Sequence, residues 1–160
     1  MSNILYIVVP CYNEQEVLPE TSKRLREKVQ TLRQSGKIDA DSRILFVNDG
    51  SKDATWEMVQ KLHEENPVFS GVNLSRNRGH QNALLAGIAV ASEHADMIIS
   101  MDADLQDDVD AMDRMIDAYE AGNDIVYGVR SSRQKDTFFK RNTAQLFYRL
   151  LHFLGAEVVY

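Results

Sequence analysis

Three oxygen-bearing side chains stand at every second position after an apolar run in the second half of the sequence. They are Asp102, Asp104 and Gln106, and the apolar run is 97–101. On an extended backbone these side chains point to one side, with about 6.5 to 7 Å between successive positions. Mg²⁺ and Mn²⁺ prefer oxygen ligands and commonly take one or two protein carboxylates, while water and phosphate complete the shell. The spacing therefore predicts a Mg²⁺ or Mn²⁺ site shared with a phosphorylated substrate.

The acids that follow this apolar run have a second interpretation, because acids also favour the N-terminus of a helix. Asp107 and Asp108 suit that role, since they stand where a helix is expected to begin. Asp102 and Asp104 come earlier, directly after the apolar run, and together they favour the metal interpretation.

Polar side chains also follow two apolar runs closer to the N-terminus. Tyr12 and Glu14 follow the run 4–9, and Asp49 follows the run 43–47. A carboxylate can accept a hydrogen bond from a nucleobase or a ribose, and an aromatic ring can stack on a base. Each residue also has a plainer role open to it: Asp49 in a tight Asn-Asp-Gly turn, Glu14 in the first turn of a helix, and Tyr12 as a lid on the core.

The polar segment 75–82 leads into a run of small residues that predicts a closely packed helix. A helix N-terminus attracts anions, so Arg76 or Arg78 could pair there with a phosphate, although surface arginines are common. His80 has no partner that the sequence identifies. A histidine of this kind is more often a structural hydrogen-bonding residue than a base.

All of these polar segments follow expected strands of one alternating pattern. Apolar runs typical of buried strands occupy residues 4–9, 43–47, 69–74, 97–101 and 125–129. Helical patterns occupy the intervals, ending near residue 34 and spanning 54–65, 79–92 and 108–121. This alternation predicts an α/β fold with a Rossmann-like, doubly wound, mostly parallel sheet and helices on both faces. In such sheets the ligand binds outside the carboxyl ends of the strands, where the polar segments lie.

Local signals set the expected ends of the first elements. Pro10 is expected to end the first strand. Asn13 and Glu16 have the spacing of a capping box for the first helix. Asp53 and Thr55 are expected to cap and open the second helix.

The segment after the fifth expected strand is basic and amphipathic. Arg130 and Arg133 open a stretch, 130–152, that holds six basic side chains and one acid, in a chain of net charge −6. Bulky apolar residues recur in it at roughly helical spacing: Phe138, Phe139, Leu146, Phe147, Leu150, Leu151, Phe153 and Leu154. Such a helix can lie on an anionic membrane surface, or it can simply cover the sheet. Both interpretations stay open.

Composition excludes several classes of protein. The 160 residues are 44% hydrophobic, enough for one core. A net charge of −6 argues against a general nucleic-acid binder, which needs a broad basic face. Cys11 stands alone and forms no internal disulfide, which favours a reducing compartment. No apolar run approaches the roughly 20 residues of a membrane span. We therefore expect a cytoplasmic protein.

Three ordered motifs resemble those of family 2 inverting glycosyltransferases of the GT-A fold. The motifs are Val-Val-Pro-Cys-Tyr-Asn-Glu at 8–14, Val-Asn-Asp-Gly-Ser at 47–51 with Asp53 and Thr55, and Met-Asp-Ala-Asp-Leu-Gln at 101–106. The motif Ser-Arg-Asn-Arg-Gly-His-Gln at 75–81 is similar to the polyprenyl-phosphate branch, which includes dolichol-phosphate mannosyltransferases and undecaprenyl-phosphate glucosyltransferases. The resemblance covers residues 4 to about 133.

The resemblance implies a role for each motif. The residues around the nucleotide sugar would be Pro10, Tyr12, Glu14, Asp49 and Asp102. The metal on the diphosphate would be held by Asp102, Asp104 and Gln106. The acceptor phosphate would be received by Arg130, with help from Arg133.

The implied reaction moves a hexose from a UDP-glucose-like donor to a polyprenyl phosphate at the cytoplasmic face of a membrane. It would be a single inverting displacement, in which the metal neutralises the departing diphosphate. A lipid phosphate is already anionic and needs little help from a general base. No base is therefore assigned within the chain, and we expect a base, where the acceptor needs one, to lie beyond Tyr160.

The resemblance also suggests how the chain is divided. We expect residues 1–136 to be the nucleotide-sugar-binding core. Residues 137–160 would be the basic helix and the start of an acceptor-side region in a longer protein.

Three alternatives come from the same residues. A family 2 transferase could extend a saccharide on an already glycosylated acceptor, for which a base would be needed. A nucleotide-binding domain could retain these motifs without catalysis. A receiver-like signalling module is also a parallel sheet with acids and Mg²⁺, but it needs paired acids after the first strand, where this chain has Pro-Cys-Tyr-Asn-Glu.

Overall fold

The computed structural model describes residues 3–104 and 107–128 of the chain. Residues 1–126 form one compact unit, and of the second unit, 127–160, only the first two residues are described. Several predictions fall outside the described residues: those for Gln106, Arg130, Arg133, the basic helix and the chain end at Tyr160. The predicted boundary at residue 136 and the expectation of a general base beyond Tyr160 therefore stay predictions.

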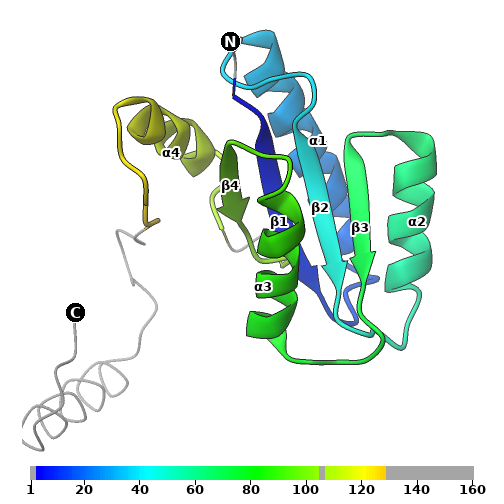
Figure 1. Cartoon of the computed structure of the whole chain (residues 1–160). Coiled ribbons are helices and arrows are strands. Elements are labelled where there is room, and N and C mark those ends of the chain that lie inside the picture. The colour runs from blue at the N-terminus through cyan, green and yellow to red at the C-terminus, as the bar shows by residue number, and fades with distance from the viewer. Residues whose placement is uncertain (1–2, 105–106, 129–160) are drawn as a thin grey trace, which may run out of the picture. The chain divides into compact units, whose positions relative to one another are not determined.

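Strands and helices alternate along the described chain (Figure 1). The elements are β1 (Leu5–Cys11), α1 (Leu18–Gln34), β2 (Arg43–Asn48), α2 (Thr55–Glu65), β3 (Phe69–Asn73), α3 (His80–Ala91), β4 (Met97–Ser100) and α4 (Ala111–Glu120). The strands pair in the order β3-β2-β1-β4, and every pairing is parallel. The carboxyl ends of all four strands therefore meet at one edge of the sheet, as predicted.

Two apolar clusters hold helices against opposite faces of the sheet. The larger cluster joins one face of β1 and β2 to α1, α2 and α4, through residues such as Ile7, Phe46 and Leu25. The smaller joins the other face to α3, through Val8, Val47 and Ala83. Helices thus cover both faces, which confirms the predicted doubly wound architecture.

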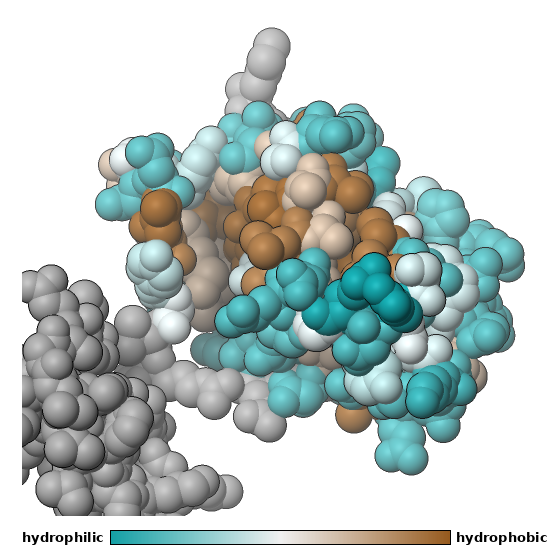
Figure 2. Space-filling model, turned by 60° about the horizontal axis from the view of Figure 1, so that its bottom comes forward, coloured by the Kyte–Doolittle hydropathy of each residue, from teal (hydrophilic) through white to brown (hydrophobic). Residues whose placement is uncertain are grey.

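The outer side of α3 remains apolar. Leu85 and Val90 on this helix are exposed. Figure 2 shows apolar residues gathered on one face of the molecule beside a polar rim. None of the helices that the structure describes has the length and apolar character needed to cross a membrane.

Pro10 does not end β1, contrary to the prediction from the sequence. The strand continues to Cys11, with Pro10 opposite Val47 of β2. Val8 accepts a hydrogen bond from Met101, on the β4 side, and Pro10 faces the same side two residues later. The last residue of β4, Ser100, is already paired with Val8. None of the described strands lies beside Pro10 on that side, so the missing N–H of the proline removes no hydrogen bond from the described sheet.

The predicted capping box of α1 is also wrong. The helix begins at Leu18, and its cap residue, Val17, makes no side-chain cap bond. Asn13 takes a left-handed conformation, with φ of 56°, and its Oδ1 accepts a hydrogen bond of 2.8 Å from the Lys52 amide. The Asn13 side chain therefore joins the loops after β1 and β2 and is not available to cap a helix.

The fifth predicted strand is absent from the residues that the structure describes. Residues 125–128 form no strand, and the side chains of Ile125 and Tyr127 are 71% and 82% exposed. A strand forms only where its backbone pairs with a neighbour, and no described backbone pairs with this segment. Val129, the last residue of the prediction, lies outside the described residues.

Candidate functional site

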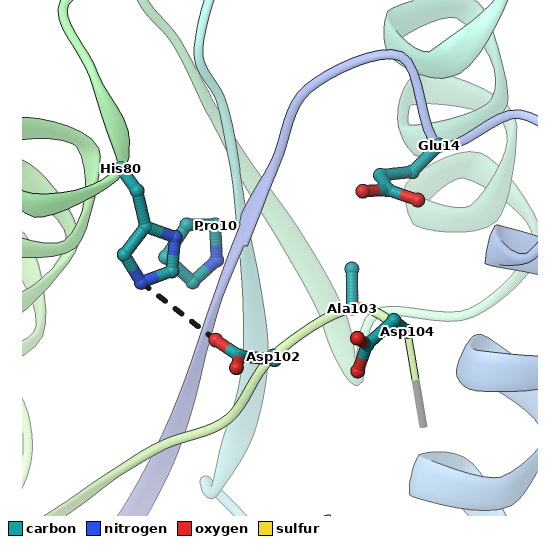
Figure 3. A pocket seen from close by; sticks show the side chains of 6 residues that line it. All are labelled: Pro10, Glu14, His80, Asp102, Ala103 and Asp104. Carbon is teal, nitrogen blue, oxygen red and sulfur yellow. Dashed lines mark ion pairs between the residues drawn. The ribbon is translucent and has the colours of Figure 1, made fainter. Parts of the chain in front are cut away.

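A pocket of about 290 Å³ lies at the carboxyl ends of β1 and β4 (Figure 3). Its lining comes from the end of β1, from the loops after β1 and β4, and from the start of α3. The lining residues are Pro10, Glu14, His80, Asp102, Ala103 and Asp104. The structure thus brings together four residues predicted for the site, namely Pro10, Glu14, Asp102 and Asp104.

A turn at residues 103–104 presents the two aspartates of the pocket, in place of the extended backbone that the sequence suggested. Ala103 is buried between them, and its carbonyl oxygen accepts a hydrogen bond of 2.6 Å from the Thr21 hydroxyl on α1. The buried alanine anchors the segment, and Asp102 and Asp104 line the pocket on either side of it.

Glu14 is positioned by hydrogen bonds between the loops after β1 and β2. Its amide donates to Thr55 Oγ1 at 2.9 Å, and the Thr55 hydroxyl donates to Asp53 Oδ1 at 2.5 Å. Asp53 Oδ1 also accepts a bond from the amide of Thr55, the first residue of α2. The N-cap residue of this helix is Ala54, with no side-chain cap bond, so the prediction that Asp53 caps α2 is wrong, whereas Thr55 opens the helix as predicted. These hydrogen bonds fix the backbone of Glu14, and the backbone places the side chain at the pocket.

The carboxyl group of Glu14 lies in an acidic environment. Partial burial raises the pKa of Glu14 above its usual value, and the negative charges of Asp104 and Asp53 raise it further. Ionised carboxylates that gather in this way favour a cation among them. The pocket is therefore suited to positive charge.

Asp49 is not among the residues that line the pocket. It is only 3% exposed, and its Oδ1 and Oδ2 accept hydrogen bonds from the amides of Arg78 and Gly79, at 2.6 and 2.9 Å. Gly50 beside it has φ of +66°, and a Cβ there would lie 2.5 Å from the Arg76 carbonyl carbon. The turn after β2 therefore packs directly on the loop before α3. These contacts fit the turn-forming interpretation, and contact with a nucleobase stays a prediction.

Ala103 and His80 line the pocket but were not predicted as site residues, and of the two only His80 has a polar side chain. It is the first residue of α3, and its Nε2 lies 3.7 Å from Asp102 Oδ1, an ion pair when the imidazole is protonated (Figure 3). One feature of the sequence could have indicated a site role for His80: the segment 75–82 follows a strand of the same parallel sheet. Its partner could not be identified because Asp102 is distant in the sequence.

Two other residues near the end of β1 do not line the pocket. Tyr12 is 39% exposed, so its ring is accessible, but it is not among the lining residues. Cys11 is buried, and burial raises the pKa of its thiol to about 12, with a smaller contribution from Glu14. At neutral pH the thiol is therefore protonated and unreactive.

The carboxylates of the pocket suit a hard divalent cation only as part of its shell. Asp102, Asp104 and Glu14 supply carboxylate oxygens around one pocket. Within residues 3–104 and 107–128, no three His, Cys, Asp or Glu side chains form a group that could hold a metal ion. Mg²⁺ or Mn²⁺ bound here would therefore take part of its shell from water and phosphate, as these ions commonly do.

Comparison with known proteins gives relatives that are glycosyltransferases. The model of the family "Glycosyl transferase family 2" matches residues 6–158. The uncharacterized glycosyltransferase YkoT of Bacillus subtilis is 50% identical over 98% of this chain and 47% of its own length. The bactoprenol glucosyl transferase of Shigella phage SfV is 39% identical over 90% of this chain and 44% of its own. The chain thus spans less than half the length of these relatives.

Solved structures of glycosyltransferases share the fold. The mannosyltransferase PcManGT from Pyrobaculum calidifontis, in complex with GDP-Man and Mn²⁺, has a TM-score of 0.55 at 22% identity, over 70% of this chain and 31% of its own. TarS 1-349 of S. aureus, in complex with UDP, has a TM-score of 0.55 at 18% identity, over 84% of this chain and 40% of its own. This likeness confirms the predicted GT-A fold. The motifs, the parallel sheet and the match over 6–158 agree, and the chain belongs to glycosyl transferase family 2.

Proposed function

We propose that this chain is the donor-binding part of a metal-dependent glycosyltransferase that moves a hexose from a nucleotide diphosphate sugar to a polyprenyl phosphate. The observation that carries the proposal is the placement of Asp102 and Asp104 in one pocket at the carboxyl edge of the sheet. The bactoprenol glucosyl transferase among the relatives supports the lipid acceptor, because bactoprenol is a polyprenyl lipid. The expected place of action is the cytoplasmic face of a membrane.

The donor would lie across the carboxyl ends of β1, β2 and β4. Pro10, Tyr12, Glu14 and Asp49 are proposed to surround the nucleoside, and Asp102, Asp104 and Gln106 to hold Mg²⁺ or Mn²⁺ on the diphosphate. When bound, the ion would neutralise the charge that develops on the departing diphosphate. The Thr21 bond to the carbonyl of Ala103 supports this proposal, because it anchors the residue between the two aspartates.

The proposed reaction is one inverting displacement. An oxygen of the acceptor phosphate forms a bond to the anomeric carbon while the bond from that carbon to the diphosphate breaks, and the nucleoside diphosphate leaves with the bonding electrons. The attacking phosphate is already anionic, so no proton has to be removed. Arg130 and Arg133 are proposed to bind this phosphate by charge-assisted hydrogen bonds.

The first test is calorimetric titration of UDP-glucose, UDP, GDP-mannose and GDP into the protein, with Mn²⁺ and then with EDTA. We expect UDP-glucose and UDP to bind with Mn²⁺ and to lose binding in EDTA. Binding of the guanine series alone would keep the site and change the donor. Absence of binding by all four ligands would overturn the proposal.

The acceptor is tested separately, in the full-length protein, with labelled donor and short-chain polyprenyl phosphate in detergent. Transfer of label to the lipid is the expected result. Transfer only to a saccharide acceptor would favour the transferase that extends a glycan. Binding of donor without any transfer would favour the nucleotide-binding domain without catalysis.

A further inference from the structure

The imidazole of His80 lies near the carboxylate of Asp102, which comes from a different segment of the pocket. His80 opens α3, whereas Asp102 follows β4, and the two side chains point toward each other (Figure 3). Their closest atoms, Nε2 and Oδ1, are 3.7 Å apart, and the side chains are 59% and 53% exposed. At 3.7 Å the contact is longer than a hydrogen bond, so the imidazole lies beside the Asp102 carboxylate without bonding to its oxygens.

The backbone directly before His80 is bonded to the Asp49 side chain. Both oxygens of this buried carboxylate accept bonds from consecutive amides, those of Arg78 and Gly79. Hydrogen bonds to an ionised acceptor are stronger than neutral ones, and two of them on adjacent amides determine the direction of the chain. Gly79, with φ of +88°, then turns the chain into α3. The position of His80 therefore depends on a side chain at the end of β2.

The same loop is also held by close backbone packing. The Cα of Gly50 approaches the loop so closely that a Cβ would lie 2.5 Å from the carbonyl carbon of Arg76 and 2.6 Å from the amide nitrogen of Asn77. The loop therefore packs directly on Gly50, and its amides also bond to Asp49. Two independent contacts set the place at which α3 begins.

We infer that Asp49 and His80 are linked positioning residues: Asp49 fixes the loop 76–79, and the loop places His80 so that its imidazole orients Asp102 for a metal-bound diphosphate. The inference rests on the proposed function for its ligand, and it gives Asp49 a role beyond contact with the nucleoside. Groups that orient a metal-binding side chain typically change metal affinity 10- to 100-fold when they are removed.

The binding test compares His80→Ala, His80→Gln and the control His94→Ala, whose exposed ring lies against Tyr6, away from the pocket residues. We expect His80→Ala to weaken Mn²⁺-dependent binding of UDP about 10-fold, the lower end of that range, with unchanged thermal unfolding. His80→Gln should recover part of the affinity, and His94→Ala should match the wild type. Equal affinity of His80→Ala and wild type would overturn the role of His80.

A double-mutant cycle separates the linked role of Asp49 from direct contact with the base. Asp49→Asn keeps the shape of the side chain but removes its charge and one acceptor. If Asp49 acts through His80, Asp49→Asn weakens UDP binding in the wild type and adds little in the His80→Ala background. Losses that simply add would overturn the link and assign Asp49 to the nucleotide alone.

A measurement without nucleotide keeps the inference distinct from the proposed function. The NMR signals of the His80 ring, in metal-free protein, should shift in both Asp102→Asn and Asp49→Asn. They should not shift in Asp96→Asn, which alters a carboxylate bonded to the Ile4 amide instead. If wild-type protein binds none of the nucleotides but the ring signals respond as expected, the proposed function fails and the positioning link stands. If Asp49→Asn leaves the ring signals of His80 unchanged, Asp49 does not position His80 and the inference is wrong.

Discussion

Thr21 donates a hydrogen bond of 2.6 Å to the carbonyl oxygen of Ala103, the residue between the two aspartates of the pocket. The threonine lies on α1 and is only 1% exposed, and Ala103 is buried as well. An unsatisfied buried carbonyl costs about 1–3 kcal/mol. Thr21→Val, which keeps the side-chain shape but has no donor, should therefore lower the free energy of unfolding in urea by about that amount.

The matched control for this change is Thr21→Ser, which keeps the hydroxyl and loses a methyl group. We expect the serine variant to retain Mn²⁺-dependent UDP binding and the valine variant to weaken it, because the segment 102–104 loses its anchor. Equal binding by the two variants would show that the hydrogen bond does not position the aspartates.

Gly87 lets α3 lie directly on the sheet. A Cβ at this position would be 2.4 Å from Val8 Cγ1 and 2.7 Å from Val47 Cγ2. Overpacking in a core costs about 1–3 kcal/mol, and the better helix propensity of alanine returns up to about 1 kcal/mol. Gly87→Ala should therefore lower the free energy of unfolding by about 1–2 kcal/mol in a denaturant titration.

The cause can be checked in a Val47→Ala background, where part of the space is opened. The destabilisation by Gly87→Ala should become smaller there, since contacting residues are coupled in their effects. An undiminished destabilisation would mean that the clash with Val47 is not its source.

Glu14 makes the stability of the metal-free protein depend on pH. Its pKa is raised by partial burial and by Asp104 and Asp53, so the folded state holds this proton more tightly than the unfolded chain. Protonated Glu14 contributes its full stabilisation at pH values below the usual pKa of a glutamate. This contribution is lost as the pH rises through the raised pKa of the folded state. Glu14→Gln should therefore unfold at a higher temperature than the wild type at pH 7, and the difference should vanish at pH 3.

This comparison is made in EDTA, because a bound cation would offset the repulsion among the carboxylates. Glu16→Gln is the control, since Glu16 is exposed and does not line the pocket. A Glu14→Gln variant that is less stable than wild type at pH 7 would contradict the predicted direction.

Asp104→Asn should abolish Mn²⁺-dependent binding of the donor while the fold is retained. The variant keeps the size of the side chain but removes a carboxylate of the pocket, and hard cations strongly prefer charged oxygen ligands. Calorimetry with UDP and Mn²⁺, together with a thermal unfolding curve, measures both effects. Asp117→Asn on α4, outside the pocket, is the control, and unchanged donor binding in Asp104→Asn would refute the metal assignment.

Much of the fold could be predicted from local patterns, and the errors have a common origin. The four strands from β1 to β4 coincide with apolar runs of the sequence. Their parallel arrangement could be predicted because strands alternate with helices. The prediction of a capping box was wrong because the Asn13 side chain accepts a hydrogen bond from the Lys52 amide on another loop. The prediction of a fifth strand was wrong for residues 125–128 because this segment pairs with none of the described strands. In each case a contact distant in the sequence, or its absence, decided the outcome.

The sequence by itself determined the family, the sheet and the pair Asp102 and Asp104, because motif spacing and hydrophobic periodicity are local properties of a chain. Only the tertiary structure decided which side chains meet at the carboxyl edge. It turned Asp49 toward the amides of Arg78 and Gly79, and it brought His80 to within 3.7 Å of Asp102. The physical reason is that parallel strands gather loops that are far apart in the sequence, and the bonds between those loops depend on packing that no single segment encodes.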